Sequence, residues 1–223
     1  MQKFDTPAPV DAVLDIPAGR IRFIAADRSD TTVEVLAADP SRSRDVKAAQ
    51  RVEVACADGV LRIQAAQTGN RILGDSGRVE VTVHLPAGSR VRAKAAVAEL
   101  RGVGRLGDVT FEGAQATVEL DETDSARLTL QAGDVLVGRL GGLAEISTLK
   151  GDLTITEAVR ATVTLRTESG RISVGAARGV SASLDAHTAY GRIHNALHTT
   201  DGAGTALTIN ATTAHGDITA RSL

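Results

Sequence analysis

Hydrophobic and polar residues alternate with a period of two along the first part of this chain, which is the pattern of half-buried β-strands. Residues 78–85 show the alternation clearly and end at Pro86-Ala87-Gly88. An earlier alternating run meets a second copy of the same tripeptide at Pro17-Ala18-Gly19. Because proline has no N–H to donate to a neighbouring strand, we expect a strand to end at each copy.

Two local signals lie between these tripeptides. Residues 39–50 are polar and predict one short helical turn. Asp58-Gly59 separates two alternating runs, and this dipeptide favours a tight hairpin because it tolerates the positive φ angles that the turn requires. Residues 1–88 are therefore predicted to form a region of antiparallel β-strands that leads into the second part of the chain.

A short motif recurs four times in the last third of the chain. Each copy has the form Thr-x-x-Gly followed by Asp or Arg and an aliphatic residue, and successive glycines are 19, 21 and 25 residues apart. Such a period with strand-like flanks is typical of one coil of chain stacked on the next. Stacked threonines would then form a ladder with a spacing of about 4.8 Å. The threonine and glycine pairs are Thr148 and Gly151, Thr167 and Gly170, Thr188 and Gly191, and Thr213 and Gly216.

Aliphatic residues and alanines keep fixed distances from these glycines. They lie seven and five residues before each glycine and, as Leu153 and Ile193 show, two residues after it. The step from five before to two after is odd, so a straight strand would place the two sets on opposite faces. We therefore expect a corner at each glycine, with both flanking strands facing inward. The predicted fold is all-β, with residues 89–223 forming a right-handed parallel β-solenoid of coils about 20 residues long.

These features resemble a bacterial family of β-strand-repeat proteins named "putative adhesin" or domain of unknown function 4097. The repeated Thr-x-x-Gly corners, the Leu85–Gly88 entry and the Val13–Gly19 start carry the resemblance, which covers nearly the whole chain. The resemblance implies a parallel stack like a β-helix and, through its name, attachment to surfaces. It implies no established reaction and no catalytic residue.

Composition narrows the classes of partner. The formal net charge is −2, from 25 basic and 27 acidic residues, which gives no electrostatic reason to bind nucleic acid. The single cysteine, Cys56, excludes an internal disulfide. The first residues contain no apolar stretch typical of a signal peptide, and no run of 18 apolar residues occurs. We therefore expect a cytoplasmic protein without membrane insertion.

Stacked coils can bring carboxylates together, as glycan-cleaving solenoids require. Asp134 and Asp152 follow the glycine in neighbouring coils, so their carboxylates are expected about 5 Å apart, a spacing compatible with a retaining glycosidase. The alternative is that aspartate after glycine suits a turn. Arg171 and Arg192 take this position in the next two coils, which also permits charge pairing along the column.

Four of the five histidines lie between residues 187 and 215. Neighbouring coils would bring His194 and His215 close enough to hold a metal ion. However, no cysteine or regular carboxylate accompanies them, so exposed histidines on loops or outward positions are the alternative. We expect no cofactor and no metal.

The sequence thus contains no recognisable catalytic motif, and it predicts a non-enzymatic scaffold or adhesin-like interaction module with an unknown protein partner. The last strand, residues 214–223, ends without a capping helix. An uncovered terminal coil is a template for another chain, so a homo-oligomer through this coil is also expected. The alternative function is a carbohydrate-binding or glycan-cleaving solenoid that uses Asp134 and Asp152.

Overall fold

The computed structural model describes residues 1–66, 77–198 and 206–223. The protein is all-β, with most strands in a large and mostly parallel sheet and one short helix. The chain forms two compact units, Met1–Ala116 and Thr117–Leu223. The sequence analysis placed a boundary at Ser89 instead, because it took the second Pro-Ala-Gly as the start of the stacked coils. Each unit is described separately below.

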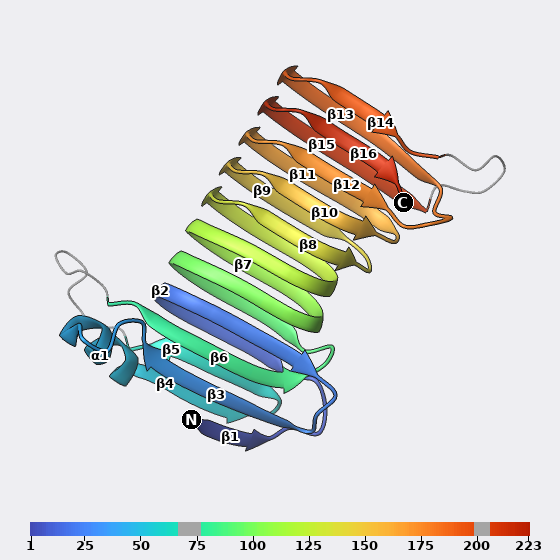
Figure 1. The fold of residues 1–223 in the computed structure, drawn as a ribbon. Helices are drawn as coiled ribbons and strands as arrows, with labels where there is room; N and C mark the ends of the chain where they lie inside the picture. Colours follow the sequence, from blue (N-terminus) through green and yellow to red (C-terminus); the bar gives the residue numbers. More distant parts are fainter. Residues whose placement is uncertain (67–76, 199–205) are drawn as a thin grey trace. The chain divides into compact units, whose positions relative to one another are not determined.

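In residues 1–66 and 77–116, the first unit contains seven strands and one helix (Figure 1). The polar segment after β3 folds as a helix of eight residues, two turns rather than the one turn expected. Asp58 and Gly59 have φ angles of 51° and 74° and join β4 to β5 in the predicted antiparallel hairpin. The elements are β1 (Gln2–Asp5), β2 (Asp11–Ala26), β3 (Asp30–Ala37), α1 (Ser43–Gln50), β4 (Val52–Ala57), β5 (Val60–Ala65), β6 (Val79–Pro86) and the first part of β7 (Arg90–Ala132).

Strand β2 shows that the antiparallel prediction for residues 1–88 was wrong in part. β3 pairs antiparallel with β1 and β6, as expected, but β2 pairs parallel with β5, β6 and β7. Pro17-Ala18-Gly19 does not end β2. The strand continues through it, with residues 11–15 against β5 and residues 19–26 against β6. The tripeptide is therefore a bend within one long strand, and coil-like parallel pairing begins before residue 89.

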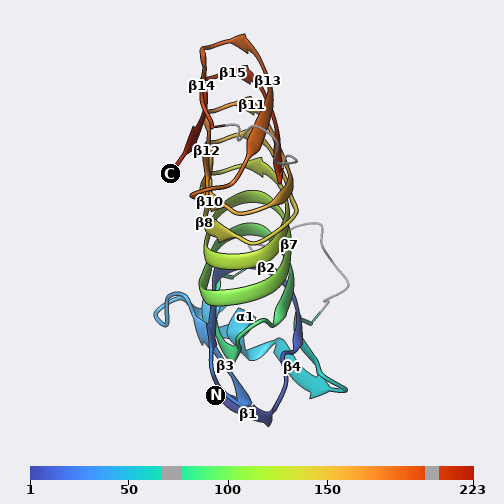
Figure 2. The same cartoon turned by 90° about the vertical axis from the view of Figure 1, so that its right-hand side faces the viewer.

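The second unit is a solenoid-like stack of coils, each made of one strand before a glycine and one strand after it. Figure 2 shows β8, β10, β12 and β14 on one side of this unit, and β11 and β13 on the other. Parallel registers align equivalent residues of successive coils, as in Leu153 against Ile172. The strands are the last part of β7, β8 (Val135–Leu140), β9 (Ala144–Lys150), β10 (Leu153–Ala158), β11 (Ala161–Ser169), β12 (Ile172–Ala176), β13 (Ala182–Tyr190), β14 (Ile193–Ala196), β15 (Leu207–His215) and β16 (Ile218–Ser222).

The coils do not stack in sequence order. The last coil, β15–β16, lies between β11–β12 and β13–β14, since β15 pairs with β11 and β13 and β16 pairs with β12 and β14. The expectation that residues 214–223 form the terminal coil was therefore wrong. The end of the stack is the coil β13–β14, called the terminal coil below, and it is the outermost pair of strands in Figure 1.

The core of the second unit is a narrow column of aliphatic side chains. Leu153, Ile172 and Ile218, each two residues after a motif glycine, are buried. The equivalent Ile193 is 47% exposed, although the sequence predicted it inside. It lies in the terminal coil, where no further coil covers it. Among the described residues no helix is long and apolar enough to cross a membrane.

Candidate functional site

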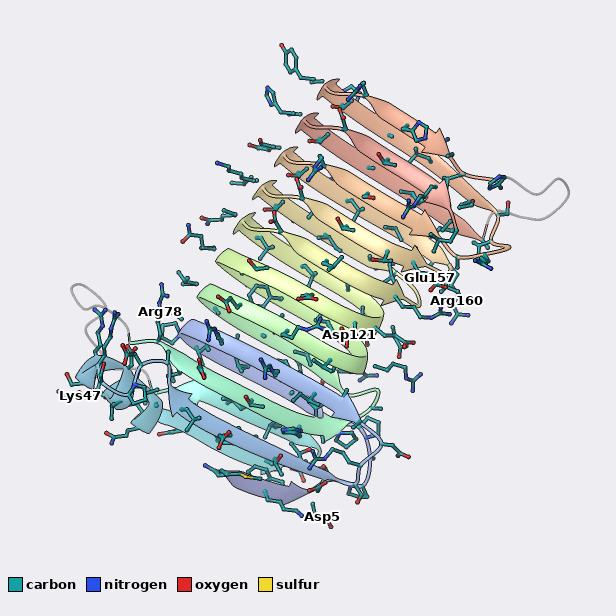
Figure 3. The ribbon with its side chains drawn as sticks, viewed as in Figure 1. Asp5, Lys47, Arg78, Asp121, Glu157 and Arg160 are labelled. Atoms are coloured by element: carbon teal, nitrogen blue, oxygen red, sulfur yellow. The ribbon has the colours of Figure 1, made fainter. Side chains whose placement is uncertain are left out.

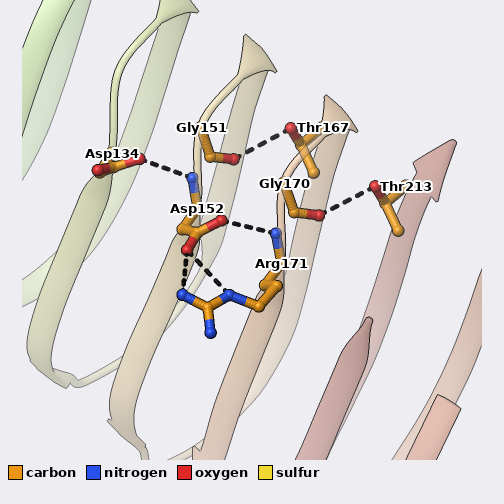
Figure 4. A network of polar contacts seen from close by, with 7 residues as sticks. All are labelled: Asp134, Gly151, Asp152, Thr167, Gly170, Arg171 and Thr213. Atoms are coloured by element: carbon orange, nitrogen blue, oxygen red, sulfur yellow. Dashed lines mark hydrogen bonds and ion pairs between the residues drawn. The ribbon is translucent and has the colours of Figure 1, made fainter. Parts of the chain in front are cut away.

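The motif threonines and glycines form a column of contacts between coils (Figure 4). The hydroxyl of Thr167 donates to the carbonyl oxygen of Gly151 at 3.2 Å, and the hydroxyl of Thr213 donates to that of Gly170 at 3.2 Å. In the terminal coil, Thr188 reaches the next glycine carbonyl of the column at 3.0 Å. Three threonines thus satisfy a backbone carbonyl of the neighbouring coil, and Thr148 instead donates within its own coil.

Glycine is required in this column because the coils approach each other too closely for a side chain. A Cβ on Gly170 would lie 1.9 Å from the carbonyl oxygen of Gly151, and one on Gly216 would lie 2.0 Å from that of Gly170. Both residues also have positive φ angles, 159° and 146°. The Thr-x-x-Gly motif therefore holds adjacent coils together.

The two candidate carboxylates belong to the same column. The N–H of Asp152 donates to Oδ1 of Asp134 at 2.8 Å. The carboxylate of Asp152 in turn accepts the N–H of Arg171 at 2.8 Å and two guanidinium hydrogen bonds at 2.8 and 3.1 Å (Figure 4). Each carboxylate thus satisfies a backbone N–H of the neighbouring coil.

The electrostatics of Asp152 do not suit a general acid. Partial burial favours its neutral form, but the N–H and guanidinium of Arg171 outweigh burial, so the pKa of Asp152 lies below its ordinary value. A glycosidase acid needs a raised pKa to stay protonated near neutral pH. The geometry supports a structural role for this pair.

The inverted coil order gives the charged column alternating signs. Along the stack, Asp152 is followed by Arg171, then Asp217, then Arg192. The N–H of Arg192 donates to Oδ1 of Asp217 at 2.8 Å, and its guanidinium lies 3.3 Å from the other carboxylate oxygen. In sequence order the two arginines would be neighbours, and like charges would face each other.

The candidate metal ligands are not brought together. His194 lies on β14 beside Thr219, whereas His215 lies on β15 beside Ser169. Within residues 1–66, 77–198 and 206–223, no group of three His, Cys, Asp or Glu side chains could hold a metal ion. The ring of His215 instead stacks on Tyr190, with centroids 5.0 Å apart and planes 13° apart. Tyr190 and His215 directly precede the motif glycines of consecutive repeats, and this shared position could have predicted the pair from the sequence.

The terminal coil has a free edge. Strand β13 pairs with β15 on one side, and no other described strand pairs with it. At the start of β13, the N–H of Leu207 donates to the carbonyl oxygen of Ser181 at 3.2 Å, so the backbone groups of Ser181 face the stack. The register with β15 is continuous from Ala182 to Thr188, and backbone groups alternate in direction along a strand, so those of Asp185 and His187 also face the stack. The backbone groups of Ala186 and Thr188 then face the free edge.

The other strands of both units carry ion pairs on their exposed faces. In the second unit, Arg139 pairs with Glu122 and Glu157 of the neighbouring coils. Figure 3 shows Glu157 and Arg160 close together at the far end of β10. Arg160 donates to the carbonyl of Gly141 at 3.1 Å, which again joins successive coils.

A hollow of about 320 Å³ lies in the first unit near α1. Its lining includes Arg20, which donates to Glu80 at 3.1 Å and to Glu99 at 2.9 Å. Arg42 of the lining pairs with Asp39 at 3.0 Å. These arginines are already paired with carboxylates, so they do not form a ready site for an anion. Cys56, on β4, is half-buried, and burial raises the pKa of its thiol.

Comparisons with known proteins give the family that this chain matches and solved structures that resemble it. The sequence model of the family described as Toastrack DUF4097 matches residues 11–221. A solved structure of a "putative adhesin" from Bacteroides fragilis NCTC 9343 is 14% identical, with a TM-score of 0.60 over 98% of this chain and 95% of that chain. Another "putative adhesin", from Parabacteroides distasonis ATCC 8503, is 16% identical, with a TM-score of 0.49 over 98% and 95%. No curated protein matches the chain.

Proposed function

This chain belongs to the Toastrack DUF4097 family, and we propose that it is a non-enzymatic scaffold that binds a macromolecular partner at the free edge of its terminal coil. The proposal rests on a difference between the column of motif residues and the free edge of β13. The repeated polar groups, including Asp152 and Thr167, already bond to neighbouring coils. The edge-facing backbone groups of β13 are left for a partner.

Strand addition is the binding mode that fits this edge. An extended segment can pair with the free N–H and C=O groups of a sheet edge, and its side chains then supply specificity. A partner coil would also cover Ile193, which is 47% exposed at the end of the apolar column. Removing this apolar surface from water would favour binding.

Three finer expectations belong to the same proposal: attachment to surfaces or, as the alternative, residence in the cytoplasm, and right-handed winding of the coils. The family name and the description of the Bacteroides fragilis protein suggest attachment to surfaces, which is a variant of scaffolding with an extracellular partner. Residence in the cytoplasm and right-handed winding of the coils stay predictions, the second because parallel β crossovers are nearly always right-handed. Neither changes the surface at which we expect binding.

A proline substitution tests the edge directly. Ala186→Pro removes one edge-facing N–H without removing a hydrogen bond to β15, whereas Ala186→Ser retains that N–H. Affinity capture with cross-linking, read by mass spectrometry, should give cross-links to β13 with the parent chain. These should be lost in the proline variant. The serine variant should keep them for a partner that binds mainly through backbone pairing. Equal capture by the proline variant would contradict the proposal, provided that circular dichroism shows an unchanged fold.

Carbohydrate binding is the second candidate, and one observation favours it. Tyr190 is 72% exposed and stacks on His215, which gives the terminal coil a flat aromatic surface of the kind that sugar rings contact. Glycan-array binding by the parent chain that disappears in Tyr190→Ala would support it. Absence of binding to any glycan would exclude it. Cleavage by Asp134 and Asp152 is not part of this candidate, because both carboxylates accept hydrogen bonds within the column.

A further inference from the structure

The free edge of β13 carries two side chains of opposite character on its outward face. Asp185 and His187 are exposed and lie on either side of Ala186. Neither side chain has a hydrogen bond or an ion pair with another described residue. Ala186, between them, directs its backbone groups to the free edge, because those of Ser181 face the stack and the direction alternates along the strand. The edge therefore presents a donor and an acceptor in fixed register.

We propose that the partner at this edge is a second copy of the same chain, whose β13 pairs antiparallel with β13 about a two-fold axis at Ala186. This inference rests on the proposed function and identifies its occupant. An antiparallel pair centred on Ala186 places Asp185 directly opposite His187 of the second copy, and the symmetry repeats the contact on the other side of the axis. Directly opposite side chains point to the same face, with Cβ atoms about 5 Å apart.

The backbone groups at the edge also fit this pairing. Those of Ala186 face the edge, so Ala186 would exchange both N–H···O bonds with Ala186 of the second copy, as a hydrogen-bonded pair of an antiparallel ladder does. Asp185 and His187 of the second copy would form the adjacent non-hydrogen-bonded pair, in which opposite side chains are closest. A shift by one residue would place groups that already face the stack at the interface.

Side-chain polarity agrees with the same register. Leu184 would lie opposite Thr188 on the inward face, above the half-covered end of the apolar column. One strand of nine residues thus supplies both the free edge and the matching acidic and imidazole side chains. A different partner would have to supply each of these separately.

Charge reversal tests the pairing, because two variants that fail alone should succeed together. Asp185→Lys would place Lys opposite His187, and His187→Asp would place Asp opposite Asp185. Sedimentation velocity of the full chain should show the parent as a concentration-dependent dimer. Each variant should bind itself at least about tenfold more weakly, because His187→Asp places two carboxylates opposite each other and Asp185→Lys removes the carboxylate opposite His187. An equimolar mixture of the two variants should form a heterodimer, since every opposite pair is then attractive.

Thr164→Lys is the matched control, because Thr164 lies in the same outward column as Asp185 but two coils further into the stack. This variant should dimerise like the parent. A monomeric parent at every concentration, single variants that dimerise like the parent, or a mixture that stays monomeric would each overturn the inference. Heterodimer formation would itself show that both variants fold. If charge reversal has no effect while Ala186→Pro still loses its cross-linked partner, the proposed function stands and the second copy is excluded.

Discussion

The terminal coil β13–β14 and the inner coil β15–β16 carry the same motif but have different environments. Ile218 of the inner coil is 1% exposed, whereas the equivalent Ile193 of the terminal coil is 47% exposed. The inner coil has Ala220 where the terminal coil has Asn195, at the next inward position. The inner coil comes later in the sequence yet is covered on both sides. Place in the stack, and not place in the sequence, determines which coil has the apolar composition.

The largest difference in unfolding free energy between variants of the inner coils and of the terminal coil is expected at the column glycines. Gly170→Ala would bring a Cβ within 1.9 Å of the Gly151 carbonyl oxygen at a φ of 159°. We expect the variant to lose about 3–6 kcal/mol of unfolding free energy, or to fail to fold. Gly191→Ala meets a similar contact, at 2.0 Å, but only the terminal coil must move to relieve it. Urea denaturation should show a loss less than half as large.

Gly179→Ala measures the cost of backbone strain in the absence of a steric clash. Gly179 has a φ of 74°, and its added Cβ would have no atom within 4 Å. We expect a loss of about 1 kcal/mol, from the φ angle alone. A loss at Gly170 no larger than that at Gly179 would show that the coils do not approach as closely as the structure indicates.

The next largest effect compares the two isoleucines. Ile218→Ala should cost about 2–5 kcal/mol of unfolding free energy, because it leaves a cavity between two coils. Ile193→Ala should cost less than about 1 kcal/mol, because solvent already reaches that side chain. Equal losses in chemical denaturation would mean that something covers the terminal coil in solution. A dilution series would then show whether a second copy covers it.

The corners and the hairpin could be predicted from the sequence because the local conformational preferences of their residues agree with the fold. The odd step across each motif glycine required a corner, and the structure has one at Gly151, Gly170 and Gly216, each with a positive φ. Asp58-Gly59 predicted the hairpin for a similar local reason. The strand break expected at Pro17 was wrong, because β2 stays paired with β7 on one side while its neighbour on the other side changes from β5 to β6.

The order of the coils could not be obtained from the motif spacing, because spacing carries no information on which coil lies beside which. Two signals were nevertheless present. Residues 207–220 are more aliphatic than 184–195, as an inner coil should be. Sequence order would also have placed Arg171 beside Arg192. Both signals concern pairs of coils, so they indicate the order of the coils only when alternative stacking orders are compared.

A smaller effect is expected from the threonine hydroxyls. Thr167→Val keeps the shape of the side chain but removes the hydrogen bond to the Gly151 carbonyl. Because Thr167 is buried, that carbonyl loses its side-chain donor away from water, and we expect a cost of about 1 kcal/mol. Thr188→Val in the terminal coil should cost clearly less, since water can replace the hydroxyl there. If the two variants unfold with equal m-values, their urea midpoints can be compared directly. The midpoint of Thr167→Val should then be lower than that of Thr188→Val.

The smallest effect on stability is expected from the charged residues that follow the motif glycines of the two coils, Asp217 and Arg192. The N–H of Arg192 holds the pKa of Asp217 below its ordinary value of 3.8, with its guanidinium contributing. A lowered folded-state pKa stabilises the protein fully above the unfolded value and loses that stabilisation as pH falls through the folded value. Asp217→Asn should therefore lower the urea midpoint at pH 7, and the deficit should shrink below about pH 4 and in high salt.

Asp134→Asn is the matched test of the alternating column. Asp134 also accepts a backbone N–H from the next coil, but its neighbour in the column is Asp152, another carboxylate. An asparagine oxygen can still accept that hydrogen bond, and the substitution removes a like charge. We therefore expect an unchanged or slightly higher midpoint at pH 7. If Asp134→Asn and Asp217→Asn lower the midpoint equally, the aspartates act only as hydrogen-bond acceptors, and charge does not select the position of the last coil between β11–β12 and β13–β14.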